Sequence, residues 1–196
     1  MSSHKQERVY VMIKPDGVAK GLIGEIIKRI EQRGLKIVAL RMFQPTVQQI
    51  HDHYPKDEQW MSRIGEKTLG TYEKYGKDPV KELGTADKLE IGKMVRKWLV
   101  DYMVSYPLVK MVVQGAHAID VVRKIAGDTL PFKAAVGTLR GDFSADSPAI
   151  ANGEKRAVMN VVHVSETPEE AAHEMAHWFT PEEIFEYKRI GEEIGF

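Results

Sequence analysis

Residues 158–170 read VMNVVHVSETPEE, an apolar run that leads directly into the start of a helix. Branched residues in a short continuous run are typical of a buried strand, and we predict a strand over residues 157–164. Thr167 then supplies a helix cap, Pro168 suits the first helical position, and Glu170 completes a capping box. The stretch therefore predicts a strand followed at once by a helix, the repeating unit of an α/β fold.

The same alternation continues along the chain. Apolar runs predict three further strands, at residues 9–13, 35–43 and 108–113. Helical spacing of apolar residues predicts helices at residues 23–33, 47–54, 94–103 and 118–126. Alternating strands and helices ordinarily favour a parallel sheet, but periodicity by itself does not fix the direction of the strands.

Composition narrows the class of protein. The chain has 196 residues, of which 43% are hydrophobic and 29% charged, so it can bury the core of one domain. Its 28 basic and 28 acidic residues cancel, which argues against an obligate nucleic-acid partner or an anionic membrane. The absence of cysteine excludes disulfides, thiolate metal sites and cysteine nucleophiles. No apolar run reaches the length of a signal peptide or membrane span, so we expect a soluble, cytoplasmic protein.

Two stretches differ from their surroundings. Residues 55–93 are rich in Lys, Glu, Asp and Gly and poor in branched apolar residues, so we expect an insertion of short helices with exposed faces. Residues 128–156 contain Pro, Gly, Ser and Asn with weak periodicity, which is typical of a long functional or mobile loop.

Residues 173–177 read HEMAH and match the H-E-x-x-H pattern of zinc peptidases. His173 and His177 would share one helix face, but the residues that follow contain no third histidine at the spacing of the extended pattern. The alternative is an ordinary amphipathic helix, whose core-facing side chains would be Ala172, Met175, Ala176 and Phe179. We favour this second interpretation over a zinc site.

His163 ends the predicted strand just before a helix start, where backbone N–H groups and the helix dipole favour anions. A buried histidine bonded only to backbone is an equally good interpretation of this residue taken alone. Asn160 and His163 have opposite parity, so a regular strand would send them to opposite faces of the sheet. If both serve one site, the backbone must bend between them, and such irregularities cluster at functional sites.

Three cationic residues are candidates for binding phosphate. Lys14 precedes Pro15-Asp16-Gly17 at the end of the first strand, and such a turn can aim its ammonium at an anion. Arg140 in the long loop and Arg123 on a helix could bind phosphate or could be ordinary surface residues. The chain has neither G-x-x-x-x-G-K-[ST] nor G-x-G-x-x-G, so a nucleotide would not be bound by a P-loop or a dinucleotide-binding turn.

Together these stretches resemble nucleoside diphosphate kinases. The matching motifs, in the family's order, are MIKPDGV at 12–18, GLIGEII at 21–27, HY at 53–54, YM at 102–103, GTLRGDF at 137–143, NVVHVS at 160–165 and WFTPEE at 178–183. The resemblance implies a ferredoxin-like four-stranded antiparallel sheet with surrounding helices, in place of a parallel sheet. It also implies one domain over residues 1–196, with a largely helical insertion at about 55–93 and a second insertion at about 144–155. A homo-oligomer is implied as well, with a hexamer favoured.

The resemblance implies a ping-pong transfer of the γ-phosphoryl group from a nucleoside triphosphate, typically ATP, to a nucleoside diphosphate. His163 matches the family's nucleophile, and a neutral imidazole is nucleophilic near pH 7. Glu174 matches the carboxylate that orients this ring, and Ser165 and Glu166 match positions beside it. Mg²⁺ would arrive on the nucleotide phosphates, with no metal site made by protein side chains.

Further positions match the family's nucleotide site. Lys14 and Tyr54 match catalytic positions, and Lys14 and Asn160 match ribose contacts. The positions that match phosphate-binding residues are Lys14, Arg123, Thr129 and Arg140.

The chain also departs from the family pattern. Val95 stands where the family has a base-stacking phenylalanine, and Leu99 stands at a second base contact. An aromatic residue of the insertion could supply the stack instead, the candidates being Trp60, Tyr72 and Tyr75. Val164 replaces a glycine next to the nucleophile, which questions the local backbone geometry. A non-catalytic nucleotide-binding scaffold is the alternative function, although the presence of His163 argues against it.

Overall fold

The computed structural model describes residues 6–190 of the chain. Within this range, a four-stranded sheet has the order β2-β3-β1-β4. Its strands are β1 (Glu7–Ile13), β2 (Lys36–Phe43), β3 (Leu108–Gly115) and β4 (Val162–Val164). Every neighbouring pair is antiparallel. The antiparallel prediction is therefore confirmed, and the parallel sheet favoured by alternation alone is wrong.

Alternation misleads here because β1 and β2 are not neighbours in the sheet. Both are antiparallel to β3, so they run parallel to each other with β3 in the gap between them. The helix that connects them, α2 (Ile23–Gln32), makes the crossover that such a unit requires. β1 and β2 are therefore connected as parallel strands are, although each is hydrogen-bonded to an antiparallel neighbour, β3.

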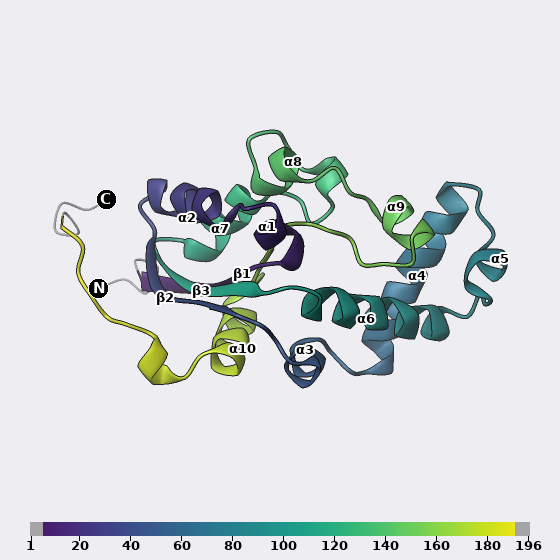
Figure 1. The fold of residues 1–196 in the computed structure, drawn as a ribbon, viewed down its shortest axis with the longest axis horizontal. Helices are drawn as coiled ribbons and strands as arrows, with labels where there is room; N and C mark the ends of the chain where they lie inside the picture. The colour runs from purple at the N-terminus through teal and green to yellow at the C-terminus, as the bar shows by residue number, and fades with distance from the viewer. Residues whose placement is uncertain (1–5, 191–196) are drawn as a thin grey trace.

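The two faces of the sheet carry two separate cores (Figure 1). Side chains of β1 alternate between them, so Val11 belongs to one core and Tyr10 to the other. The first face is covered by α2 and α7 (Ala118–Ala126). The second face is covered by α3 (Val47–His53), the end of α6 (Lys88–Val104) and α10 (Pro168–Trp178).

The first insertion is built on two long helices rather than the short helices predicted. α4 (Glu58–Lys74) packs against α6, and α5 (Pro79–Leu83) lies on the connection between them (Figure 1). A Cβ atom at Gly65 would lie 1.8 Å from the carbonyl oxygen of Lys88, so the two backbones touch. The prediction is wrong because this helix contact is made by glycines, so it does not need the branched apolar residues that the segment lacks.

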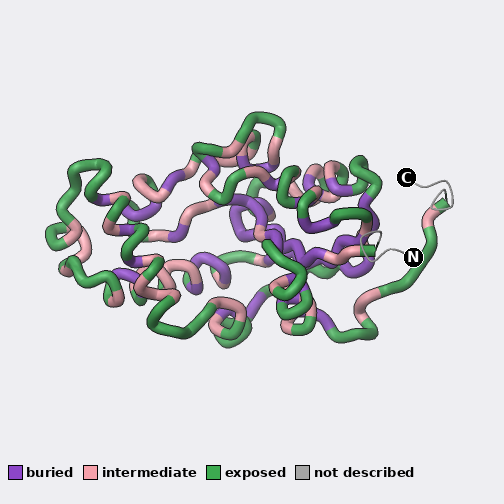
Figure 2. Tube along the Cα trace, turned by 180° about the vertical axis from the view of Figure 1, so that it is seen from behind, coloured by how far each residue is buried: buried purple, intermediate pink, exposed green. Residues whose placement is uncertain are grey.

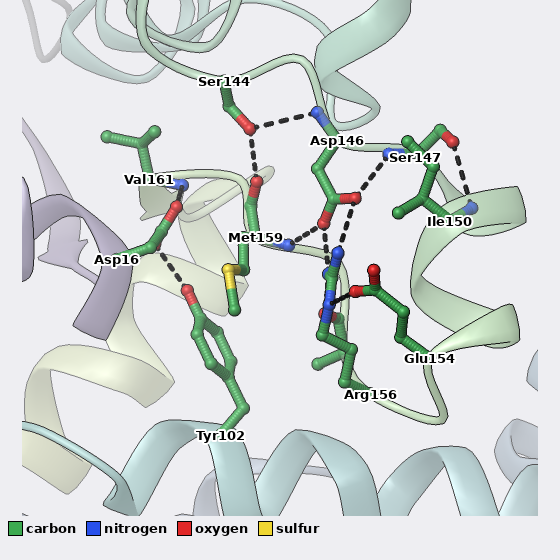
Figure 3. Close-up of polar contacts among 11 residues, drawn as sticks. Asp16, Tyr102, Ser144, Asp146, Ser147, Ile150, Glu154, Arg156, Met159 and Val161 are labelled. Carbon is green, nitrogen blue, oxygen red and sulfur yellow. Dashed lines mark hydrogen bonds and ion pairs between the residues drawn. The ribbon is translucent and has the colours of Figure 1, made fainter.

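Residues 128–156 fold into short elements instead of one long loop. These are η2 (Pro131–Lys133), α8 (Leu139–Phe143) and α9 (Pro148–Gly153). Asp146 pairs with Arg156 at 2.5 and 3.1 Å and accepts a bond from the N–H of Met159 (Figure 3). Tyr72 of α4 donates to the carbonyl of Asn152 at 3.4 Å, so the two insertions contact each other.

Exposure follows this architecture. In Figure 2, buried residues gather along the sheet, and exposed residues dominate the outer end of the first insertion. Two short elements complete the described chain, α1 (Pro15–Ala19) after β1 and η3 (Pro181–Glu183) after α10. Between residues 6 and 190, no helix combines the length and the apolar character that a bilayer crossing requires.

Candidate active site

The backbone bends sharply just before His163. β4 contains only Val162–Val164, so the predicted strand over residues 157–164 was too long. Val161 has a φ of 68°, in the left-handed region that β-branched residues rarely adopt. The N–H of Val162 donates to the carbonyl of Asn160 at 2.7 Å, which closes a three-residue turn. The backbone therefore does bend between Asn160 and His163, as it must if both residues serve one site.

The K-P-D-G turn holds this bend from one side. The carboxylate of Asp16 accepts bonds from the N–H of Val161 at 3.1 Å and the hydroxyl of Tyr102 at 2.5 Å (Figure 3). The N–H of Lys14 donates to the carbonyl of Val161 at 2.8 Å. A Cβ atom at Gly17 would lie 2.8 Å from that carbonyl, so only glycine allows this approach. These contacts offset a backbone strain of about 1–3 kcal/mol.

Arg140 braces the same bend from the other side. Its guanidinium donates to the carbonyls of Asn160 at 3.2 Å, Val162 at 2.8 Å and Gly127 at 2.7 Å. Three of its five N–H groups are thus engaged, and two are left for a ligand. Burial, and then the positive charge of Arg123, lower the pKa of Arg140 to about 10, so it stays cationic at neutral pH.

His163 is held by a buried carboxylate. Its Nε2 lies 2.6 Å from Oε1 of Glu174, and the hydroxyl of Ser165 donates to Oε2 at 2.5 Å. Glu174 is only 4% exposed. Because a carboxylate can only accept, Nε2 carries the proton and donates it, which leaves the lone pair of the neutral ring on Nδ1. The geometry therefore presents Nδ1 of His163 as a nucleophilic nitrogen.

The phase of α10 brings Glu174 inward. The buried residues of this helix are Ala171, Glu174 and Trp178, whereas Ala172 and Ala176 are exposed. The core-facing side chains expected from hydrophobicity were therefore partly wrong, because the helix is turned so that its glutamate reaches His163. The predicted cap is confirmed, since Thr167 accepts a bond from the N–H of Glu170 at 3.1 Å. The predicted capping box is not formed, because the carboxylate of Glu170 accepts the N–H of Glu166 at 2.6 Å, one residue before the cap.

The histidines of HEMAH do not assemble a zinc-peptidase site. His173 is exposed, and Nε2 of His177 lies 3.1 Å from the backbone carbonyl of Gln49. Within residues 6–190, the side chains grouped closely enough to hold a metal are those of His53, His163 and Glu174. The glutamate of HEMAH thus serves His163, which overturns the peptidase interpretation.

His53 is a further member of the cluster. Its ring stands perpendicular to that of His163, with centroids 5.3 Å apart, and Nε1 of Trp178 donates to its Nδ1 at 3.3 Å. Burial, and then the charge of His163, hold the pKa of His53 well below its ordinary value, so this ring is neutral at pH 7.

Sequence reasoning gave no role to three residues that the structure places at this site: Asp16, His53 and Tyr102. Each adjoins or lies within a motif quoted for the resemblance, which was the signal available. A motif identifies a stretch, however, and only the fold shows which of its side chains touch one another.

The cationic side chains surround the bend. Lys14 is 8% exposed and donates to Oδ1 of Asn160 at 2.7 Å. Burial, and then the charge of Arg140, lower the pKa of Lys14 to about 8. Nδ2 of Asn160 donates to the carbonyl of Thr129 at 2.9 Å. Arg123 is more exposed and pairs with Glu166 at 3.1 Å.

An open cavity adjoins the histidine cluster. It has a volume of about 460 Å³, and His53, Tyr54 and Glu174 line it together with Asp52, Pro55, Lys56, Glu170 and His173. Burial, and then the charge of Glu174, raise the pKa of Tyr54, so its hydroxyl stays protonated and can donate a hydrogen bond.

The insertion brings one aromatic residue to the site. The ring of Trp60 lies 6.2 Å from that of Tyr54. Tyr72 is buried against α9, and Tyr75 stands at the far end of α4, so Trp60 is the best placed of the three candidates.

Val95 and Leu99 are both half-buried on α6. Leu99 packs against the core on the second face of the sheet, and the antiparallel contact of α4 with α6 brings Val95 opposite the start of α4.

Val164 causes no distortion of the backbone beside His163. It is the last residue of β4, it is absent from the residues with positive φ, and it is 6% exposed within the first core. Valine fits where the family has glycine because the backbone here is an ordinary extended strand.

A ferredoxin-like sheet carries an oriented histidine just after a bend that Lys14 and Arg140 contact, and Arg123 pairs with Glu166 three residues beyond that histidine. These features define an α/β protein with a site suited to phosphorylated substrates. The family model of nucleoside diphosphate kinase matches residues 7–62 and 88–184. The chain belongs to the nucleoside diphosphate kinase family and is therefore a phosphotransferase. Members of this family generally depend on a divalent cation.

Individual relatives agree. A nucleoside diphosphate kinase of Pyrobaculum aerophilum is 46% identical over 180 residues, which cover 92% of this chain and 98% of the relative. That of Pyrococcus horikoshii is 38% identical over 187 residues, which cover 95% of this chain and 93% of the relative. Residues 63–87 of this chain, which the family model leaves unmatched, fall within the first insertion.

Solved structures show the same likeness. An NDP kinase from Pyrobaculum aerophilum superposes with a TM-score of 0.89 at 45% identity, covering 92% of this chain and all of the other. A nucleoside-diphosphate kinase from Borrelia burgdorferi, solved as a transition state mimic with bound vanadate and ADP, has a TM-score of 0.76 at 32% identity. In that comparison, 97% of this chain and 96% of the other are covered.

Proposed function

We propose that this kinase passes the phosphoryl group through His163. Nδ1 attacks the γ-phosphorus of a nucleoside triphosphate such as ATP, an N–P bond forms, the P–O bond to the β-phosphate breaks, and the nucleoside diphosphate leaves. A second nucleoside diphosphate then takes the phosphoryl group by the reverse steps. The observation that supports this order most directly is the 2.6 Å contact between Glu174 and Nε2, which leaves Nδ1 free to attack.

The phosphates would be bound by the cationic side chains around the bend. Arg123 can exchange its exposed partner Glu166 for phosphate oxygens, and Arg140 has two N–H groups left after bracing the backbone. Tyr54 would donate to the transferring group, and Thr129 would contact the phosphates. Such fixed charges stabilise the charge that spreads over the phosphoryl oxygens in the transition state.

Lys14 and Asn160 would contact the ribose. The 2.7 Å bond from the ammonium of Lys14 to the amide oxygen of Asn160 holds both side chains in place for this contact. The base would lie against Val95, Leu99 and Trp60. Trp60 replaces the aromatic stack that Val95 lacks, and stacking of this kind discriminates weakly among bases.

Mg²⁺ fits this site as a companion of the nucleotide. The Asp16 and Glu174 carboxylates are each committed to two donors. The residues facing the phosphate positions are cations, so the nucleotide oxygens would hold the ion. When bound, Mg²⁺ neutralises phosphate charge.

We also propose the wider organisation: one domain over residues 1–196, assembled as a cytoplasmic homo-oligomer, with a hexamer favoured. Support for assembly comes from the edge strand β2, where Leu40 and Met42 are 52% and 55% exposed. Light scattering coupled to gel filtration would measure the assembly number.

Detection of a phosphorylated enzyme tests the catalytic proposal. The protein would be mixed with γ-labelled ATP and Mg²⁺, and acid-labile label would be mapped by peptide mass spectrometry. We expect label on His163 that added GDP discharges, no label in His163→Ala, and full label in the control His173→Ala. A folded, ATP-binding wild type that takes up no label would contradict the proposal and favour a nucleotide-binding scaffold.

A further inference from the structure

Three side chains of the types that bind metal ions meet at the proposed nucleophile, which is one of them. One ring nitrogen each of His53 and His163 and one carboxylate oxygen of Glu174 lie within 4.8 Å of one another. Nε2 of His163 is 2.6 Å, and Nδ1 of His53 3.8 Å, from the same oxygen of Glu174. The side chains of His53 and Glu174 are 5% and 6% exposed, so this is a built cluster and not a chance group of surface residues.

We propose that His53, His163 and Glu174 form a binding site for a borderline-soft transition-metal dication such as Zn²⁺, and that the bound ion switches the kinase off. Two imidazoles and one carboxylate are the protein ligands of open zinc sites, which keep a fourth position for water. Mg²⁺ prefers six oxygen ligands and is not expected to compete. The site would therefore distinguish an inhibitory ion from the Mg²⁺ that accompanies the nucleotide.

The surroundings can accommodate the ion. Zn²⁺ needs its ligand atoms at about 2.0–2.2 Å, so the 2.6 Å contact of His163 with Glu174 must open to admit it. His53 must give up the bond from Trp178, which at 3.3 Å is already long. The hydroxyl of Ser165 keeps the second oxygen of Glu174 in place, the kind of outer contact that orients a metal ligand.

A cavity gives an ion access to the cluster, and the hydroxyl of Tyr10 is a further polar group on this side of the sheet. The cavity of about 460 Å³ reaches His53 and Glu174, so an ion and its water can enter. The hydroxyl of Tyr10 is, within the described chain, the one buried side-chain polar atom with no hydrogen-bond partner. The ring of Tyr10 lies 6.1 Å from that of His163, on the side of the sheet that carries the cluster.

Inhibition follows from where the proton goes. The ion binds the lone pair of Nε2, so the proton on that nitrogen leaves and the neutral ring carries its proton on Nδ1 instead. Nδ1 then has no lone pair with which to attack phosphorus. No oxidant or other reactant is needed. This consequence rests on the proposed phosphohistidine, whereas the binding site itself does not.

Wild-type protein labelled with ¹⁵N-histidine would be titrated with Zn²⁺ without nucleotide, and calorimetry would give the stoichiometry. We expect about one equivalent to bind and to shift the ring-nitrogen signals of His53 and His163, but not of His173. His53→Gln should weaken binding at least tenfold, as expected for loss of a ligand, and His173→Asn should bind as wild type does. Shifts at His173 and His177 instead, or no saturable binding, would overturn the site.

The kinase reaction is then assayed on the same samples. Zinc-loaded wild type should take up label from MgATP much more slowly than zinc-free wild type, and a chelator should restore the rate. Zinc on the predicted ligands with unchanged labelling would refute the switch. Zinc binding in a protein that is never labelled, with or without metal, would leave the site intact and refute the phosphohistidine instead.

Discussion

Lys14 lies in an environment that lowers the pKa of its ammonium group. It is buried, it lies near the cation Arg140, and its nearest partner is the neutral amide of Asn160 rather than a carboxylate. Its pKa of about 8 follows from that combination. A nucleotide would supply the missing negative charge, so the strain on this residue in the free protein is relieved by its ligand.

This pKa makes nucleotide affinity depend on pH. Below pH 8 the free site carries the Lys14 cation, and above it the proton and the charge are lost. Arg140, with a pKa of about 10, stays charged across this window. We expect the affinity for ADP to fall about tenfold between pH 7 and pH 9, the effect of one charge-assisted contact.

Calorimetry at the two pH values would measure this change. Lys14→Met should bind ADP weakly at both and show little change between them. A wild type whose affinity is the same at pH 7 and pH 9 would show that Lys14 keeps its charge or makes no contact.

At the scale of elements, a single bend links α1, α6 and β4. Val161 holds its left-handed conformation because Asp16 of α1, just after β1, accepts a hydrogen bond from its N–H, and because Tyr102 from α6 fixes that carboxylate. His163 follows two residues later, so the position of the proposed nucleophile depends on contacts between segments distant in sequence.

Removing one hydroxyl tests that linkage. Tyr102→Phe leaves a buried carboxylate with one donor fewer, which should lower the free energy of unfolding by about 1–3 kcal/mol. Urea denaturation would measure the loss. Tyr106→Phe, at a residue 48% exposed, is the matched control and should change stability little. Equal midpoints for the two variants would mean that the bond to Asp16 contributes nothing.

The contact of α4 with α6 offers a second test at this scale. Gly65→Ala places a methyl group against the carbonyl of Lys88, so the helices must separate, and we expect a loss of about 1–3 kcal/mol. Gly70→Ala on the same helix meets no atom within 4 Å and should instead stabilise the helix by up to about 1 kcal/mol. Thermal or urea unfolding should give opposite signs, and two changes of the same sign would contradict this packing.

At the scale of the whole molecule, the insertions form an extension that touches the site. α4 contacts α9 through Tyr72 and Asn152, and its first turn carries Trp60 next to Tyr54. Asp57 accepts the N–H of Trp60 at 2.7 Å, so the start of the helix is fixed by its own cap. The insertion is therefore placed next to the proposed nucleotide site, from outside the sheet.

This placement predicts a kinetic signature. Trp60→Ala should raise KM for several nucleoside diphosphates by about tenfold, the effect of losing one stacked base, with kcat nearly unchanged. Steady-state kinetics with ADP and GDP would measure it. Tyr75→Ala, at the far end of α4, should behave as wild type. A fall in kcat at constant KM would place Trp60 in the chemistry rather than at the base.

The sequence by itself determined the features that depend on neighbours along the chain. Apolar periodicity located β1, β2, β3 and α7, and the residues before α10 predicted its capped start. The parity of Asn160 and His163 required a bend if both were to serve one site, without showing what holds that bend. These signals are local, because propensity, caps and spacing act over a few residues.

Only the tertiary structure decided which distant side chains meet. It set β3 antiparallel between β1 and β2, turned α10 so that Glu174 faces His163, and added His53 to that pair. It also placed the backbones of α4 and α6 in contact at glycines, residues whose low helix propensity argues against a helix when only the local sequence is considered. The physical reason is that long-range packing and buried hydrogen bonds outweigh local preference, and no short stretch of sequence contains both partners of such a contact.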